Sequence, residues 1–211
     1  MSETLLLIFE LIGTIAFAAS GALTGLEKKM DIFGVATLGV VTSVGGGVIR
    51  DLILGNTPPA TFNKPVYALV AIAVSIIIFI PTVRRFLFKR QALYDFMMLI
   101  MDSLGLGIFT VVGIQVAYTS DGSHNVFLLI FVGMITGIGG GVLRDVLAGN
   151  TPYIFIKHFY ACASLIGAVA CIVLWKAIGQ SAAIAGGSLV IIVLRLLAAH
   201  YRWSLPKAEV E

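Results

Sequence analysis

GGGVIRDLILGNTP, residues 45–58, returns almost unchanged as GGGVLRDVLAGNTP, residues 139–152. Ten of the fourteen aligned positions are identical, at a constant offset of 94 residues. Three consecutive glycines weaken an α-helix, and an Arg-Asp pair is costly inside a bilayer. Both copies nevertheless lie in strongly apolar sequence, so the duplication calls for a structural explanation.

The composition around this motif is that of a membrane protein. The 211 residues are 59% hydrophobic and 12% charged, and the mean hydropathy is +1.03. Soluble domains carry about 25% charged residues. We therefore predict an all-α polytopic membrane protein that forms a single membrane domain over residues 1–211. The first apolar run has no preceding basic region and no clear cleavage site, so we interpret it as a retained helix.

The apolar runs predict seven transmembrane helices, because a span needs about 20 mostly apolar residues. The predicted spans are residues 4–26, 32–54, 65–83, 93–118, 126–148, 158–178 and 182–203. Nine Lys and Arg residues fall on the side of the C-terminus and two on the other side. The positive-inside rule then places the N-terminus outside and the C-terminus in the cytoplasm. This topology explains the basic residues, and we expect no nucleic-acid partner.

The likeness between the two halves extends beyond the glycine motif. Four residues of span one align with four of span four: Glu10, Gly13, Phe17 and Gly21 with Asp102, Gly105, Phe109 and Gly113. Residues 4–90, with spans one to three, therefore repeat as residues 93–180, and residues 182–203 form an additional helix. Because three is odd, the second copy enters the membrane from the opposite side. Such inverted 3+3 repeats place a transport site near the midplane, where the copies meet.

The glycine triplets Gly45–Gly47 and Gly139–Gly141 are the first candidate site. Each glycine costs up to about 1 kcal/mol relative to alanine in a helix. We expect spans two and five to kink or break there and to turn freed backbone groups toward a shared polar path. Hydroxyls of Thr42, Ser43 and Thr136 would face the same path. Close helix packing is the alternative, which we prefer for the scattered glycines of spans one and four.

Charged residues inside the spans are the second candidate site, because they are rare and usually functional in membranes. They are Glu10, Arg50, Asp51, Asp102, Arg144 and Asp145, with Asp95 and Arg195 as further candidates. Equal depth predicts an outer pair, Glu10–Arg50, and an inner pair, Asp102–Arg144. For the two motif aspartates, lining the path and capping the next turn remain open alternatives. We expect Arg195 to extend toward the cytoplasm.

Other chemistry finds no support in the sequence. GNTP is interpreted as a helix stop, since glycine and proline end helices. No phosphate-binding loop motif is present. His124, His158 and His200 lack metal-ligand spacing, and Cys162 and Cys171 are too far apart on one helix for a disulfide. We expect no enzymatic activity, no metal site and no cofactor.

The seven spans, the 3+3 repeat and the segments GGGVIRD and GGGVLRD resemble the prokaryotic trimeric intracellular cation (TRIC) channels. The resemblance implies a homotrimer in the prokaryotic inner (plasma) membrane, in contact with membrane lipid. Each protomer would hold an hourglass pore for potassium and sodium ions, lined by spans two and five with the glycine triplets as hinges. Bacterial sequences of this kind also carry a glycine-transporter label. The lysine-bearing phosphoinositide site of the animal members has no clear counterpart here.

From the residues alone, three functions stay open. The first is a monovalent cation channel. The second is a secondary transporter of a small solute such as glycine, whose carboxylate would meet a half-helix N-terminus at the glycine break. The third is a membrane scaffold without transport.

Overall fold

The computed structural model describes residues 3–120, 125–156 and 159–203, and every element within these ranges is an α-helix. Two basic residues used for the orientation, Lys157 and Lys207, lie outside the described ranges, as do His124 and His158.

Within these ranges, six helices are long and apolar enough to cross a membrane: α1 (Glu3–Glu27), α2 (Ile32–Ile53), α6 (Gln91–Ser120), α7 (Val126–Leu147), α9 (Tyr160–Ile178) and α10 (Gln180–His200). The pair α4 (Val66–Phe79) and α5 (Pro81–Leu87) makes the count seven if it is one bent span. Short helices α3 (Ala60–Asn63) and α8 (Tyr153–Ile156) follow the two GNTP loops. The prediction of a seven-helix all-α membrane protein is confirmed.

The third predicted span, residues 65–83, is interrupted. Helix α4 ends at Phe79, and α5 begins at Pro81 with a bend of 76° between them. Proline disfavours helical backbone in the residue before it. Ile80 accordingly adopts φ −54° and ψ 130°. The third predicted span is thus a bent pair of helices.

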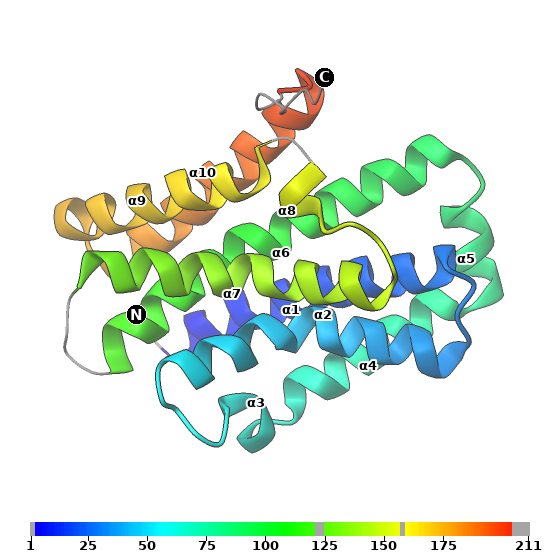
Figure 1. Cartoon of the computed structure of the whole chain (residues 1–211), viewed down its shortest axis with the longest axis horizontal. Coiled ribbons are helices and arrows are strands. Elements are labelled where there is room, and N and C mark those ends of the chain that lie inside the picture. The colour runs from blue at the N-terminus through cyan, green and yellow to red at the C-terminus, as the bar shows by residue number, and fades with distance from the viewer. Residues whose placement is uncertain (1–2, 121–124, 157–158, 204–211) are drawn as a thin grey trace, which may run out of the picture.

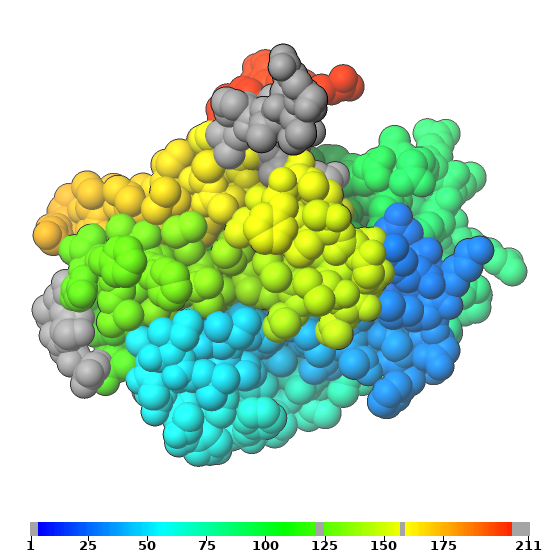
Figure 2. Space-filling model, viewed as in Figure 1, coloured from blue at the N-terminus to red at the C-terminus, as the bar shows by residue number. Residues whose placement is uncertain are grey.

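The two copies of the repeat are arranged alike (Figure 1). Helices α1, α2 and α4 pack against one another, and so do α6, α7 and α9. Between the copies, α1 packs against α6 and α2 packs against α7, so equivalent helices meet each other. Helix α10 lies against α6 and α9. In Figure 2 the segments that contain α2 and α7, cyan and yellow-green, border each other across the visible face.

Helices α2 and α7 meet through glycine at two reciprocal points. A Cβ added to Gly46 would lie closer than 3.0 Å to the backbone oxygen of Thr136, and one on Gly140 would overlap the backbone oxygen of Thr42 in the same way. Gly140 follows Gly46 by 94 residues, and Thr136 follows Thr42 by the same repeat offset. Small residues let membrane helices approach closely. The glycines therefore allow a backbone contact across the pseudo-two-fold axis.

Helices α1 and α6 also meet at two reciprocal glycine positions, and here each glycine lies against an aromatic ring of the other helix. A Cβ on Gly13 would lie 3.1 Å from the ring of Phe109, and a Cβ on Gly105 would overlap the ring of Phe17. The two rings contact each other with centroids 5.3 Å apart. These glycines serve helix packing, as the sequence analysis preferred for the scattered glycines.

The predicted break of spans two and five at the triplets is wrong, whereas a kink without loss of helical hydrogen bonding stays a prediction. Helical hydrogen bonding continues through Gly45–Gly47 in α2 and through Gly139–Gly141 in α7. Each triplet lies against the other helix, so packing across the interface compensates the low helix propensity of glycine. The GNTP segments do end both helices, with Gly55 at φ +73° and Gly149 at φ +68°.

We expect Gly46→Ala to lower the melting temperature of the purified protein by about 5 °C. Overpacking a tight interface costs about 1–3 kcal/mol, which exceeds the gain of about 1 kcal/mol in helix propensity. Thermal unfolding in detergent measures the effect.

Gly47→Ala is the matched control, because the nearest atom to its added Cβ, Arg50 Nη2, is 3.7 Å away. This variant should melt at or above the wild-type temperature. Equal destabilisation by both substitutions would contradict the packing role of Gly46.

Candidate functional site

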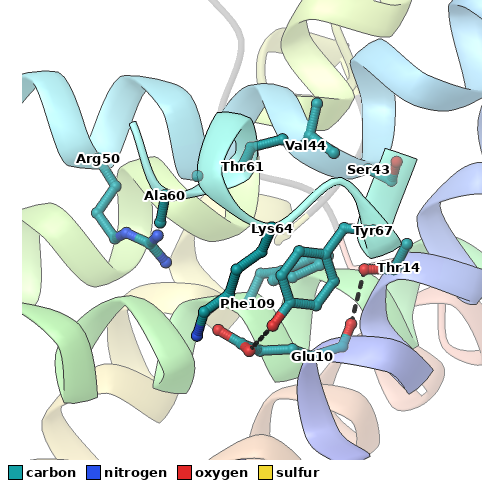
Figure 3. A pocket seen from close by; sticks show the side chains of 11 residues that line it. Glu10, Thr14, Ser43, Val44, Arg50, Ala60, Thr61, Lys64, Tyr67 and Phe109 are labelled. Carbon is teal, nitrogen blue, oxygen red and sulfur yellow. Dashed lines mark hydrogen bonds between the residues drawn. The ribbon is translucent and has the colours of Figure 1, made fainter. Parts of the chain in front are cut away.

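Two cavities with charged linings open at opposite ends of the helix bundle. The first, called the outer cavity after the predicted orientation, has a volume of about 60 Å³ and lies between α1, α2, α4 and the α2–α4 connection. Its polar lining includes Glu10, Ser43, Arg50, Lys64 and Tyr67 (Figure 3). The inner cavity, of about 770 Å³, lies between the first half of α6, the end of α10 and α8. Four charged residues line it: Asp95, Asp102, Arg195 and Arg202.

The two cavities lie on either side of the glycine contact. Gly47 lines the outer cavity, one residue beyond Gly46 in α2. Gly141 lies one residue beyond Gly140 in α7, and its added Cβ would be 3.8 Å from Asp102 Oδ1. Asp102 lines the inner cavity. The contact between α2 and α7 therefore lies between the two cavities.

The predicted inner pair is confirmed. Arg144 Nη1 donates to Asp102 Oδ1 at 2.7 Å, and both side chains are essentially inaccessible to solvent. Arg144 Nη1 also donates to Ser20 Oγ, and Arg144 Nε donates to Asp145 Oδ1 at 2.8 Å. One guanidinium thereby joins α7 to α6 and α1. The carboxylates of Asp102 and Asp145 neutralise its charge, and a buried ion requires such pairing.

The predicted outer pair is wrong. Glu10 and Arg50 line the same cavity, but no ion pair within 4.0 Å joins them in the described structure. Arg50 Nε instead donates to Asp51 Oδ1 at 2.8 Å. Glu10 Oε2 accepts a hydrogen bond from the hydroxyl of Tyr67. Equal depth did not specify on which side of its helix each charge lies.

The two motif aspartates anchor the ends of their helices. Asp51 Oδ2 accepts from the backbone nitrogen of Ala60 at 2.9 Å, and Asp145 Oδ2 accepts from that of Tyr153 at 2.9 Å. Each carboxylate thus binds its neighbouring arginine and the first residue of the following short helix. The capping alternative of the sequence analysis holds for both residues, and each arginine is oriented by its own aspartate.

The hydroxyls proposed for the path are mostly engaged within their own helices. Thr42 donates to the backbone oxygen of Leu38 at 2.6 Å, and Thr136 donates to that of Val132 at 2.7 Å. Both threonines are buried at the α2–α7 contact. Ser43 donates to its own helix at 3.0 Å and also lines the outer cavity.

Arg195 lies elsewhere than expected. Only 4% of it is exposed, and its guanidinium carbon lies 4.6 Å from the ring centre of Tyr160. Its Nη2 is 4.0 Å from Asp102 Oδ2. The expected extension to the cytoplasm is wrong because α10 packs against α6 and α9 and turns this residue inward. Asp95 is exposed at the start of α6.

Sequence reasoning missed the tyrosines and Ser20. Tyr67 and Tyr160 occupy matching positions in the repeat, so their duplication was a usable signal. Tyr153 covers Arg144 with its ring 4.9 Å away, and burial raises the pKa of its phenol. Ser20 gave no such signal, because the matching residue of the second copy is Val112. Within the described residues, no cluster of His, Cys, Asp and Glu could hold a metal ion.

The fold and the buried charges define an integral membrane protein that consists of two three-helix copies and a seventh helix. A family model described as glycine transporter matches residues 7–82 and 99–176, one segment for each copy. The chain is 35% identical to a UPF0126 membrane protein of Deinococcus radiodurans, over 93% of this chain and 89% of that protein. It is 34% identical to the UPF0126 inner membrane protein YadS of Escherichia coli K12, over 93% of each.

Solved structures give the same family. One, described as the structural basis for conductance through TRIC cation channels, is 37% identical with a TM-score of 0.84 and covers 97% of both chains. A TRIC trimeric intracellular cation channel orthologue from Rhodobacter sphaeroides is 33% identical with a TM-score of 0.84, over 95% of this chain and all of that one. The chain belongs to the TRIC family, as its sequence motifs predicted.

We expect Asp102→Asn to destabilise the protein severely. Removing one partner of a buried ion pair costs about 3–5 kcal/mol, and here it leaves Arg144 short of a counter-charge. Thermal unfolding in detergent and the yield of monodisperse protein measure this effect.

Glu10→Gln, at the matching position of the first copy, is the control. Its amide oxygen still accepts from Tyr67, so we expect a change below about 1 kcal/mol. Equal destabilisation by both substitutions would contradict the structure, in which Asp102 belongs to a buried ion pair and Glu10 only accepts a hydrogen bond from Tyr67.

Proposed function

We propose that this protein is a non-enzymatic channel for monovalent cations, potassium and sodium, with a path through each protomer. The observation that carries the proposal is the pair of polar cavities that face each other across the Gly46–Gly140 contact. The solved relatives described as TRIC cation channels support it. The path would run between α2 and α7 along the glycine triplets Gly45–Gly47 and Gly139–Gly141, with the two copies contributing equally.

The electrostatics of the path permit cations. Asp51 neutralises Arg50, and Asp102 with Asp145 neutralises Arg144. A path with paired arginines is polar without a net positive charge. Cation channels replace the hydration shell with oxygen ligands. Ser43 lines the outer cavity and offers a hydroxyl oxygen to a cation there.

Opening would separate α2 from α7 at the glycine contact. Gly46 and Gly140 themselves carry no side chains at this contact, so the helices can slide or part there without rotamer changes at these two positions. In this proposal the triplets act as a smooth interface between intact helices.

The assembly and orientation complete the proposal. We propose a homotrimer in the inner membrane, as the description of the Rhodobacter sphaeroides orthologue names a trimeric channel. The excess of basic residues on one side supports a cytoplasmic C-terminus. Surrounding lipid would cover the exposed apolar side chains of α4 and α9.

A small-solute carrier is the second candidate, favoured by the description of the matching family model. The carrier hypothesis expected the carboxylate of glycine to bind a half-helix N-terminus at the glycine triplets. The intact helices α2 and α7 offer no such N-terminus there. The channel is therefore the better supported proposal.

Purified protein in planar bilayers should give unitary potassium currents. The same preparation in liposomes should not concentrate glycine against a gradient. Saturable uptake of labelled glycine without any unitary current would contradict the channel and support the carrier.

The position of the path can be tested with Ser43→Cys, in a background with Cys162 and Cys171 replaced by alanine. A water-soluble thiol reagent added on the side of the N-terminus should reduce the potassium current, since Ser43 lines the outer cavity. Leu52→Cys, on the same helix with 57% exposure at the surface, is the control and should leave the current unchanged. Inhibition of Leu52→Cys but not of Ser43→Cys would contradict a path along the side of α2 that faces the outer cavity.

A further inference from the structure

A third cavity lies between α6, α7 and α9, and we call it the interhelical pocket. Its volume is about 190 Å³. Six of its lining residues are aliphatic or aromatic and the seventh is a lysine: Ile114, Tyr118, Val126, Leu129, Ile172, Trp175 and Lys176. None of these residues lines the outer or the inner cavity. The interhelical pocket is therefore a separate site, and its lining favours an occupant that is mostly apolar.

The interhelical pocket lies where α6 and α9 end and α7 begins. Lys176 precedes the last residue of α9 by two positions, and Ile114 precedes that of α6 by six. At 1.5 Å per residue, the pocket reaches about 9 Å below the end of α6. Tyr118 and Trp175 contact each other here, with ring centres 4.7 Å apart. Tyr and Trp concentrate at the membrane–water boundary, so the pocket extends from the level of the lipid headgroups into the level of the acyl chains.

In the first copy of the repeat, the protein fills the matching space itself. At offsets of 92 to 94 residues, the counterparts of Tyr118, Leu129 and Ile172 are Leu26, Val35 and Phe79. These three counterparts belong to one hydrophobic cluster that also contains Val83 and Leu87 of α5. The 76° bend between α4 and α5 places these two side chains in the cluster. The first copy thus closes this region with aliphatic groups.

In the second copy, no described helix corresponds to α5. Helix α9 continues past Ile172 to Ile178 as one helix, and α10 begins directly afterwards at Gln180. Helix α10 packs against α6 and α9, and none of its residues lines the interhelical pocket. The space that Val83 and Leu87 occupy in the first copy therefore corresponds to the interhelical pocket in the second. By this comparison, an aliphatic chain fits it.

The charge and exposure of the lining indicate which aliphatic molecule fits. Val126 is 47% exposed, so the interhelical pocket reaches the apolar outer surface of the helix bundle. Lys176 is exposed and is the charged residue among the seven that line the pocket. A lysine near the membrane surface attracts anionic lipid headgroups. An occupant with an apolar chain and an anionic head satisfies both parts of the lining.

We propose that the interhelical pocket binds one anionic phospholipid. One acyl chain lies between α6, α7 and α9 against Ile114, Leu129 and Ile172, and the phosphate group lies against Lys176. The acyl chain takes the place that two side chains of α5 hold in the first copy. This site is independent of the solute that the protein transports, because it is separate from both charged cavities.

The fluorescence of Trp175 reports directly on this site. The chain has two tryptophans, so Trp203→Phe leaves Trp175 as the single one. The full-length protein is placed in bilayers that mix phosphatidylglycerol, which is anionic, with phosphatidylcholine, which is zwitterionic. One lipid at a time carries bromine on its acyl chains, which quenches a tryptophan on contact. We expect phosphatidylglycerol to bind at Trp175 about fivefold more tightly than phosphatidylcholine.

Two variants in this background test the two parts of the site. Lys176→Gln removes the charge and should abolish the preference for phosphatidylglycerol. Val126→Phe adds a ring to the lining, which should exclude the acyl chain and also abolish the preference, while thermal unfolding checks that the variant is folded. Lys89→Gln is the matched control, because it removes the same charge outside the interhelical pocket and should leave the preference unchanged.

Three results would each overturn the proposal. The first is equal quenching of Trp175 by the two lipids in the Trp203→Phe protein. The second is a preference for phosphatidylglycerol that survives Lys176→Gln. The third is a Trp175 that neither lipid quenches, which would indicate that another copy of the chain covers the interhelical pocket.

Discussion

The rest of the structure depends on the backbone contact between α2 and α7. Gly46 lies against the backbone oxygen of Thr136, and Gly140 lies against that of Thr42. In a bilayer, helices associate through close packing, since lipid tails are as apolar as their side chains. Two reciprocal contacts of this kind require matching glycines in both copies. The duplicated triplet is thus the consequence of a pseudo-two-fold axis that passes between two helices.

From this contact the two copies diverge. In the second copy, Arg144 is held by Asp102, Asp145 and Ser20, and Arg195 of the seventh helix lies beside the same acid. In the first copy, the matching arginine has only its own aspartate, and the matching acid binds a tyrosine. The two copies carry matching charges, and additional partners connect those of the second copy to three helices. In the first copy, Glu10 and Arg50 line the outer cavity without an ion pair between them.

The sequence predicted the features that repetition and hydropathy encode. The offset of 94 residues identified the equivalent helices, and depth in the membrane found the inner ion pair. The GNTP segments marked the helix ends. These features are local or follow from symmetry, so one chain with two copies contains enough information to find them.

The failures share a physical reason. A triplet of glycines weakens a helix, but whether it breaks depends on what packs against it, and the partner here is the other triplet. Glu10 and Arg50 lie at the same depth, yet the orientation of each around its helix axis directs them to Tyr67 and Asp51. Arg195 turns inward only because α10 packs against α6. Interhelical orientation is a tertiary property, and depth alone does not provide it.

Hydrogen exchange at the glycine triplets tests the central claim most directly. In the purified protein, mass spectrometry of peptides that cover residues 45–54 and 139–148 measures how fast the backbone amides exchange. Intact helices packed against each other predict exchange as slow as in the preceding turns of α2 and α7. Rapid exchange confined to Gly45–Gly47 and Gly139–Gly141 would show open helices at the membrane centre and would contradict the account.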